Sequence, residues 1–465
     1  MVHFRLLSTS ALATASLFAS TVSFAASPTV ADEPLQSVTP IAFDFGGELR
    51  LRYDGTHALP TSAHGESENS DYLRLRTRLW GQMTAGQLTG FLRLADEFRY
   101  YRSPNSEKGK QRFPDTVFID ALYLKYADAF NGLMTITVGR QEMAFGAKRI
   151  ISDGTGGDGS RSAYFDGARL TLNVDRQRTL DLFGVYMARH DWLPTLGKKH
   201  DATEAHTKAY DYETSGYNQT EYGAGLYYQD RSNKAFGWDA YYVYKVEDGE
   251  HSKVINKVTK GTRTLFQTST AGFRLLPQFT ETISGEGEFA LQAGTDSLLA
   301  VMAYAGVSYA PKVTMKPKLT LATQFLSGDE KGYRGDHAWH AVFNRETGIG
   351  EVPAPMYDKY AYNNLLYPHV KVELTPFANH TVVAQVGPMF APVREERTAT
   401  EDYGNFRGLY AQVKYSFAVG KCFDAALMKG FSLAFTGEYL GKGDYFKDDA
   451  GRDALFGRAE LNYKF

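Results

Sequence analysis

Arginines recur at every second position in two stretches near the start of the chain. Arg50 and Arg52 form one pair, and Arg74, Arg76 and Arg78 form a run of three. A guanidinium group binds a carboxylate through two parallel hydrogen bonds and stays charged at physiological pH. Because successive side chains of a β-strand point to opposite faces, a spacing of two places each set on one face. The pattern therefore indicates a surface that recognises carboxylate-bearing molecules.

Alternation adds further charged residues to the same face. The basic ones are Arg93, Arg458 and Lys464. The acidic ones are Glu48, Glu97, Glu438 and Glu460. Two compatible interpretations follow: a path for anionic solutes, or an internal lattice of ion pairs. Because substitutions in the lumen of a barrel tune selectivity, Arg74, Arg76 and Arg78 should be replaceable without loss of folding.

No catalytic or cofactor motif accompanies these residues. Gly154 to Gly159 matches G-x-G-x-x-G, but a dinucleotide site also needs a parallel strand before it and a helix after it, and neither is predicted here. We interpret the segment as an outer loop, with a calcium site at Asp153 and Asp158 as a minor alternative. The histidines lack a HExxH arrangement, and no G-x-S-x-G is present. The sequence thus predicts no cofactor, no metal and no enzyme, although an enzyme or a surface-binding protein on the same scaffold stays an alternative.

The elements that must position the arginines are β-strands. Between Tyr72 and Trp80 the odd-numbered positions carry leucines and a threonine, and the even-numbered positions carry the arginines. Similar alternation continues along most of the chain. It predicts eighteen strands: 42–54, 71–85, 87–98, 116–127, 133–140, 165–174, 179–189, 221–229, 236–246, 263–275, 279–291, 298–310, 316–327, 364–374, 379–391, 404–416, 430–441 and 454–465.

The connections between these strands alternate between short and long. This rhythm is typical of transmembrane antiparallel β-barrels of outer membranes, which have short periplasmic turns and longer extracellular loops. Two connections depart from it, because 292–297 is short for a loop and 417–429 is long for a turn. The last strand ends on the aromatic residue Phe465. Such an ending resembles the C-terminal signal by which the barrel-assembly machinery recognises outer-membrane proteins. A secreted β-sandwich or solenoid is the alternative.

The N-terminal residues and the composition indicate where the protein is located and which partners it has. Arg5 is followed by the apolar, small-residue stretch Leu6 to Val22 and then by a small-residue site ending at Ala25, so residues 1–25 are predicted to be a signal peptide. Residues 26–41 are a short lead-in, and 42–465 form one barrel domain. With 30 Tyr, 30 Phe and 43% hydrophobic residues, the chain is too polar for helical spans and too aromatic for disorder. Its net charge of −2 argues against nucleic acid as a partner, and the single Cys422 excludes an internal disulfide.

Two segments carry a resemblance to a known family. The first is Gly139-Arg140-Gln141-Glu142, followed by Phe145-Gly146, Arg149 and Phe165-Asp166-Gly167-Ala168-Arg169-Leu170. The second is Gly443-Asp444-Tyr445-Phe446 with Phe456-Gly457-Arg458 and the residues to Phe465. Both resemble the alginate-export family of outer-membrane barrels. The resemblance implies a monomeric 18-stranded barrel whose arginine-rich lumen passes an acidic uronate polymer, gated by an outer loop and a long periplasmic turn.

The resemblance also suggests where gates would lie. Segment 417–429 matches the long periplasmic turn, and segment 99–115, with Arg99, Arg102, Lys108, Lys110 and Arg112, matches the outer loop. The sequence thus predicts an outer-membrane channel for an acidic polysaccharide or smaller anionic solutes, with the lipid bilayer and the barrel-assembly machinery as partners. A general or sugar-selective uptake porin is the alternative within transport.

Overall fold

Strands make up nearly all of the regular structure. The computed structural model describes residues 40–60, 67–102, 116–152, 164–188, 191–197, 219–249, 264–330, 335–344, 349–353, 363–394, 404–422, 429–446 and 453–465. Outside these ranges lie the predicted signal peptide, almost all of the lead-in, and the candidate calcium segment with Asp153 and Asp158. Among the described residues, no helix has the length and apolar character needed to cross a membrane.

Eighteen long strands lie within the described ranges, and each overlaps one of the predicted strands. The first nine are β1 (Ile41–Pro60), β2 (Ser67–Ala85), β3 (Leu88–Tyr101), β4 (Thr116–Asp128), β5 (Met134–Gln141), β7 (Phe165–Asn173), β8 (Arg178–Met187), β10 (Gln219–Asp230) and β11 (Phe236–Gly249). The other nine are β12 (Thr264–Pro277), β13 (Ile283–Gly294), β14 (Leu298–Tyr309), β15 (Lys318–Leu326), β17 (Leu365–Leu374), β18 (His380–Phe390), β19 (Phe406–Phe417), β20 (Phe431–Lys442) and β21 (Ala454–Lys464). The strand prediction is confirmed, with shifts of a few residues at the ends.

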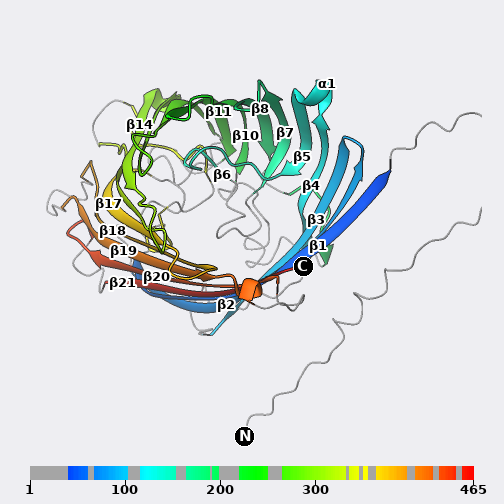
Figure 1. Ribbon diagram of the computed structural model, residues 1–465. Helices are drawn as coiled ribbons and strands as arrows, with labels where there is room; N and C mark the ends of the chain where they lie inside the picture. Colours follow the sequence, from blue (N-terminus) through cyan, green and yellow to red (C-terminus); the bar gives the residue numbers. More distant parts are fainter. Residues whose placement is uncertain are drawn as a thin grey trace, which may run out of the picture. The chain divides into compact units, whose positions relative to one another are not determined.

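These strands form a closed antiparallel barrel, as predicted (Figure 1). Each pairs with the next along the chain, and β21 pairs with β1 from Glu48↔Lys464 to His57↔Leu455. Closure leaves no open edge between first and last strands, which satisfies backbone hydrogen bonds in a lipid environment. Short elements complete the described structure: α1 (Ala129–Gly132), the 3₁₀ turns Thr295–Ser297 and Val419–Cys422, and β6 (Ile151–Ser152), β9 (Leu196–Gly197) and β16 (Phe343–Asn344).

The two ends of the barrel differ in their connections. At the end that holds Ile41 and Phe465, the strands are joined by short turns such as Gly86, which adopts a left-handed backbone. We call this the turn end and the opposite one the loop end. In outer-membrane barrels short turns face the periplasm. The predicted exception at 292–297 is a three-residue 3₁₀ turn, Thr295–Ser297.

The outer face of the barrel is apolar and exposed. Leu49 is 42% exposed and Leu51 is 44% exposed, whereas Arg50 and Arg52 between them are buried. Half of each strand therefore presents hydrocarbon to its surroundings, as a lipid-facing surface requires. The side chains at the alternate positions of each strand point into the barrel.

The inner face is not uniformly polar. On β8 the inward residues change from Asp181 near the turn end to Phe183, Val185 and Met187 toward the loop end. Two connections cover such apolar positions from within. Residues 142–152 and 335–344 fold inward and meet as the parallel pair of β6 and β16, and Figure 1 shows β6 inside the ring of strands. Apolar side chains of these segments and of the wall form one buried cluster inside the barrel.

Candidate conduction pathway

Seven arginines lie on the inner wall formed by β21, β1, β2 and β3, and we call them the arginine stripe. Its members are Arg50, Arg52, Arg74, Arg76, Arg78, Arg93 and Arg458. The first five are at most 6% exposed, and the side chains of the last two are 14% exposed. The sequence left two compatible interpretations open for these arginines, an anion path and an ion-pair lattice. In the structure they are packed under neighbouring groups.

Like charges stand directly opposite each other within the stripe. In the register of β1 and β2, Arg50 faces Arg76, and Arg52 faces Arg74. Cβ atoms of directly opposite residues lie about 5 Å apart, and like charges in such pairs destabilise a sheet. Four guanidinium groups thus form a two-by-two patch, an arrangement that anions would stabilise.

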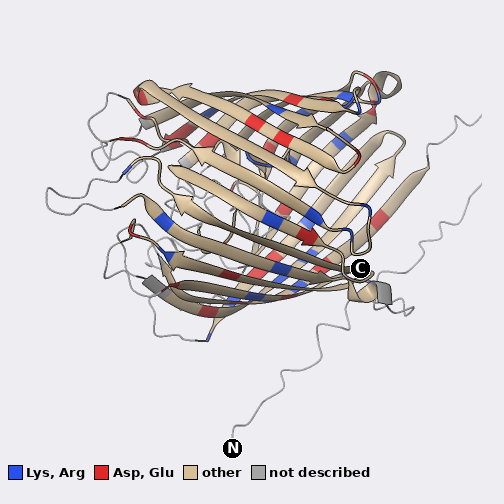
Figure 2. Cartoon of the chain, turned by 60° about the vertical axis from the view of Figure 1, so that its left-hand side comes forward, with Lys and Arg blue, Asp and Glu red and all other residues tan. Residues whose placement is uncertain are grey.

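Carboxylates separate most of the guanidinium groups, as the ion-pair interpretation expected. Figure 2 shows basic and acidic residues interspersed along the strands. The distances are 2.6 Å for Arg74 to Glu97, 2.5 Å for Arg76 to Glu48, 2.9 Å for Arg78 to Asp120, 2.7 Å for Arg93 to Asp120, 2.8 Å for Arg52 to Asp54 and 2.7 Å for Arg458 to Asp54. The stripe is therefore both an ion-pair lattice and a concentration of positive charge.

Arg50 has the loosest ion pairs of the stripe. Its nearest carboxylate oxygens among the described residues belong to Glu97, at 3.8 Å, and Glu460, at 3.9 Å. Its Nε and Nη2 atoms are buried and donate no hydrogen bond to any described residue. Both carboxylates have other partners, because Glu97 binds Arg74 and Glu460 accepts a hydrogen bond from Asn462 at 2.6 Å. Among the arginines of the stripe, Arg50 therefore has the weakest ion pairing to the described residues.

Two carboxylates from inward connections also contact the stripe. Glu142 lies 2.5 Å from Arg93, and Glu351 lies 3.0 Å from Arg458. They attach the inward segments to the basic wall.

The predicted role of Glu438 needs correction. It is buried on β20, but in the described structure its hydrogen bonds go to Gln412 and to the backbone N–H groups of Glu351 and Val352, rather than to the stripe. Lys464 is mostly exposed at the turn end and lies 3.8 Å from Glu48. Glu438 thus holds a connection in the lumen instead of balancing an arginine.

Removing the Glu438 carboxylate should release residues 349–353 and raise single-channel conductance. Its oxygens lie 3.1 Å and 2.9 Å from the two backbone nitrogens, and alanine at this position leaves both donors without that acceptor. Glu438→Gln keeps one acceptor oxygen and should change conductance less. Planar-bilayer recordings of Glu438→Ala check this. Unchanged conductance in well-folded protein would show that the segment does not restrict the pore.

From the structure we expect that replacing Arg74, Arg76 and Arg78 together destabilises the barrel, whereas the sequence predicted that folding would stay intact. Each holds a carboxylate in a buried position, and removing one partner of a buried ion pair typically costs about 3 to 5 kcal/mol. The carboxylates Asp54 and Asp120 were not predicted from the sequence. Asp54 has the parity of Glu48 and could have been found, whereas Asp120 lies at a register shift between β3 and β4, where alternation fails.

The first resemblance motif forms a structural clamp. Arg140 on β5 donates two hydrogen bonds to Asp166 on β7, at 2.7 and 2.9 Å, and two to Asp191, at 2.7 and 2.9 Å. It also binds the carbonyl of Ile119 and lies over the ring of Tyr164, 3.6 Å from its centroid. The guanidinium thereby joins two strands to the segment after β8. This arrangement stabilises the wall.

The other motif residues also have structural roles. Gly139 has φ 120°, and a Cβ there would lie 2.2 Å from the carbonyl oxygen of Leu122. Gln141 donates hydrogen bonds to backbone carbonyls, and Phe165 belongs to the buried cluster. Arg169 binds Asp181 at 2.8 Å, and a Cβ on Gly167 would meet the backbone of β8. In the structure the motif therefore supports close strand packing.

A partly buried carboxylate stabilises the conformation of segment 335–344 through contacts within the segment. Asp336 Oδ2 lies 2.7 Å from His340 Nε2, and Oδ1 accepts the N–H of Ala338 at 2.9 Å. Burial raises the pKa of Asp336, but the contact with His340 outweighs it, so the pKa lies below its ordinary value of 3.8. A lowered folded-state pKa contributes stability above the unfolded pKa, and this contribution is lost as pH falls through the folded pKa.

The conformation of this segment should therefore persist from neutral pH down to about pH 4 and weaken in more acidic solution. The buried Trp339 reports the change, since unfolding of the segment would expose its ring and shift its fluorescence to longer wavelength. Asp336→Asn should remove the acid transition. A shift centred above pH 5 that survives in this variant would assign the transition to another group.

The two predicted gates are largely outside the described residues. Of segment 99–115, Arg99 lies on β3 beside Tyr72, Arg102 lies 2.8 Å from Asp71, and residues 103–115 are not described. Of segment 417–429, the described part includes the turn Val419–Cys422. Gating by either segment stays a prediction.

A closed, charged barrel with an apolar outer face defines an outer-membrane channel of the porin type. The family model for alginate export matches residues 42–390, and the chain belongs to that family. Among solved structures, OccK1 (OpdK) of Pseudomonas aeruginosa is similar, with 12% identity, a TM-score of 0.53 and coverage of 91% of this chain and 98% of that one. OccK9 (OpdG) of the same organism has 10% identity, a TM-score of 0.54 and the same coverage. These two likenesses show the fold alone. No curated protein matches.

Proposed function

We propose that this outer-membrane channel conducts an acidic polysaccharide, or smaller anionic solutes, past the arginine stripe. The observation that supports it most is the two-by-two patch in which Arg50 faces Arg76 and Arg52 faces Arg74. Carboxylates of the wall balance Arg52, Arg74 and Arg76, but Arg50 has no carboxylate oxygen of a described residue closer than 3.8 Å, so the patch keeps an attraction for a further anion. A polymer with one carboxylate per sugar would bind it through two-pronged hydrogen bonds.

Movement along such a wall requires exchange of partners. The carboxylates of Glu142 and Glu351 occupy stripe arginines, and an acidic polymer would compete with them for the same guanidinium groups. Because each exchange replaces one ion pair by another, no arginine passes through an unpaired state. We propose that the chain acts in this way as a monomeric, passive conduit and performs no catalysis. Its insertion would depend on the barrel-assembly machinery.

Block of ion current by oligosaccharides tests the substrate class. Oligouronates should interrupt the current through the purified channel at lower concentrations than neutral oligosaccharides of equal length. Equal block by both would favour the sugar-selective uptake porin. Enzymatic turnover of the oligouronate without conductance would favour an enzyme on the same scaffold.

A further inference from the structure

A hollow in the lumen wall lies over β3, β4, β5 and β7, and we call it the β4–β5 hollow. Its volume is about 440 Å³, which is within the range of pockets that hold small molecules. Arg93 lines it, so the hollow adjoins the arginine stripe. Because its lining residues Lys125 and Thr135 lie close to the connection between β4 and β5, the hollow is near the turn end of the barrel.

Four hydrogen-bond donors that line the hollow have no partner among the described residues. The exposed ammonium of Lys125 has no ion pair there, and the hydroxyl of Tyr123 makes no hydrogen bond. The hydroxyls of Thr135 and Thr137 likewise make none within the described part of the chain. In a wall where many charged groups are paired, these four groups can bind a solute without first breaking a contact within the protein.

The strand register brings the four donors together. Lys125 on β4 is directly opposite Thr137 on β5, and Cβ atoms of such pairs lie about 5 Å apart. Tyr123 and Thr135 are each two residues away along their own strands, which keeps them on the same face at a distance of about 7 Å. One ion with several acceptor oxygens can therefore contact more than one of them.

The charge of Lys125 is not balanced by the other charged groups of the lining. Glu142 lines the hollow, but it lies 2.5 Å from Arg93. Arg169 also lines the hollow and pairs with Asp181 at 2.8 Å. Each of these carboxylates therefore has a cation of its own, and Lys125 adds a positive charge that attracts an anion.

The donors favour phosphate over carboxylate. A carboxylate is bound best by the planar fork of a guanidinium, and both guanidinium groups of the lining, Arg93 and Arg169, are already held by protein carboxylates. Ammonium and hydroxyl groups are single-point donors. A phosphate group carries a charge of about −1.5 to −2 and has three strong acceptor oxygens that point in different directions. Lysine binds such a group as a point charge.

An aromatic stack borders the same hollow. Trp80 stacks on Phe91 with ring centroids 5.9 Å apart, and Phe91 stacks on Tyr123 at 5.0 Å. Opposite Tyr123 on β5 is Gly139, which has no side chain to cover the second face of the ring. An aromatic face packs against apolar C–H surface. The hollow thus has room for a small organic group that carries the phosphate.

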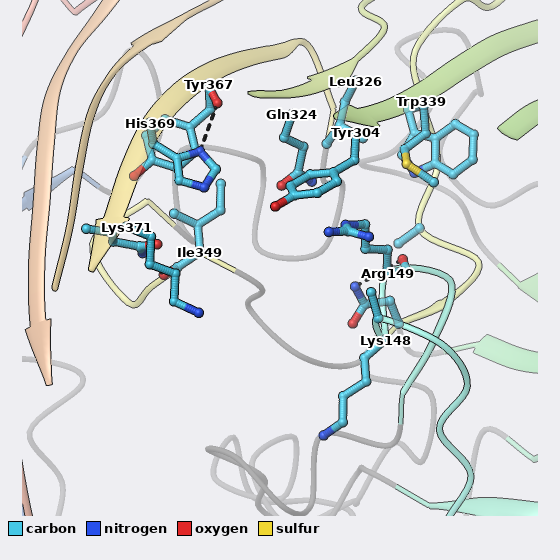
Figure 3. Close-up of a pocket in the computed structure, with 15 residues that line it drawn as sticks. Lys148, Arg149, Tyr304, Gln324, Leu326, Trp339, Ile349, Tyr367, His369 and Lys371 are labelled. Atoms are coloured by element: carbon cyan, nitrogen blue, oxygen red, sulfur yellow. Dashed lines mark hydrogen bonds between the residues drawn. The ribbon is translucent and has the colours of Figure 1, made fainter. Parts of the chain in front are cut away.

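The hollow in Figure 3, between β14, β15, β17 and the inward segments, has its cations paired. Arg149 lies on one side of it and Lys371 on the other. Arg149 is 2.7 Å from Glu286, and Lys371 is 3.2 Å from Glu373. Lys125 has no such carboxylate among the described residues, so it is better placed than either of them to bind an external anion.

We infer that the β4–β5 hollow binds a phosphate group, with Lys125 supplying the charge and Thr137, Thr135 and Tyr123 supplying hydroxyl donors. Inorganic phosphate and a sugar phosphate present the same group to these donors. The inference goes beyond the proposed function, because a carboxylate path along the arginine stripe does not require a phosphate site.

Isothermal titration calorimetry of the full-length chain, in detergent micelles and phosphate-free buffer, tests the inference. Inorganic phosphate, glucose-6-phosphate, acetate and glucose are titrated separately. We expect saturable binding of at least one phosphate compound, weaker binding of acetate and no binding of glucose. Binding of inorganic phosphate identifies a site for the free ion. Binding of glucose-6-phosphate alone identifies a site that also needs the organic group.

Three variants locate the phosphate. Lys125→Gln should weaken its binding about tenfold or more, the usual loss for a hydrogen bond to a charged group. Thr137→Val keeps the shape of the side chain without its hydroxyl, should weaken binding about threefold or more, and covers the case in which Lys125→Gln fails to fold. Lys414→Gln is the matched control and should bind as the wild type does. Lys414 is an exposed lysine on β19 with no ion pair to a described residue, and it does not line the hollow.

Wild-type phosphate affinity in both Lys125→Gln and Thr137→Val would overturn the inference, as would equal affinity for acetate and phosphate. An equal loss in Lys414→Gln would also overturn it, because binding would then follow the total charge of the lumen. If no phosphate compound binds but oligouronates block the channel, only this inference fails. If oligouronates do not block the channel either, the proposed function fails with it.

Discussion

Neutralising Arg50 and Arg52 together should sharply reduce the preference of the channel for anions while the barrel stays folded. Both residues belong to the patch of opposed arginines, so the double change removes half of its charge. The carboxylates they leave keep other partners: Asp54 binds Arg458, and Glu97 binds Arg74. We therefore expect Arg50→Gln/Arg52→Gln to insert normally and to require about tenfold more oligouronate for block, in line with the loss of charge-assisted hydrogen bonds.

Lys312→Gln is the matched control for this double variant. Lys312 is a cation in a turn outside the lumen, where it is 71% exposed and pairs with Glu281. Its loss should alter neither selectivity nor block. Wild-type behaviour of the double variant in folded protein would place the substrate path away from the stripe.

Replacing Arg140 by methionine should strongly lower the stability of the barrel. The side chain makes five hydrogen bonds, to Asp166, Asp191 and the carbonyl of Ile119, and is almost completely buried. Methionine fills the volume but leaves two carboxylates without their cation. Breaking a buried ion pair costs about 3 to 5 kcal/mol. The temperature at which the folded barrel converts to the slower-migrating form on gels should fall markedly.

Arg178→Met provides the comparison for Arg140→Met. Arg178 also pairs with an aspartate, Asp175, at 2.6 Å, but the pair lies in an exposed turn where water screens it. The conversion temperature should change little. If both variants convert at the wild-type temperature, the clamp at Arg140 does not stabilise the wall.

The fold could be predicted because a barrel repeats one local rule. Strand alternation and the rhythm of connections are visible in short stretches, and together they give eighteen strands with boundaries a few residues from those observed. The same rule puts Arg50 and Arg52 on the face opposite Leu49 and Leu51, and the structure has them there. Alternation assigns side chains to the correct face wherever one face of a strand is charged and the other is apolar.

What could not be predicted depends on contacts between distant segments. Phe343 pairs with Ile151, which is nearly two hundred residues earlier in the sequence. No local sequence pattern predicts that these two connections meet inside the barrel. Apolar inward residues on β8 gain apolar partners from these connections, since Phe145 stacks on Phe183. Asp120 escaped detection because a register shift interrupts alternation.

The reversal potential of the wild-type channel in a planar bilayer under a KCl gradient is the most direct test of an anion-conducting pore. A conduction path along the arginine stripe predicts a reversal potential displaced from zero toward the equilibrium potential of chloride. Addition of oligouronate should move the reversal potential back toward zero, because the oligouronate occupies the stripe. A reversal potential at zero, or one displaced toward the equilibrium potential of potassium, would contradict the proposed function.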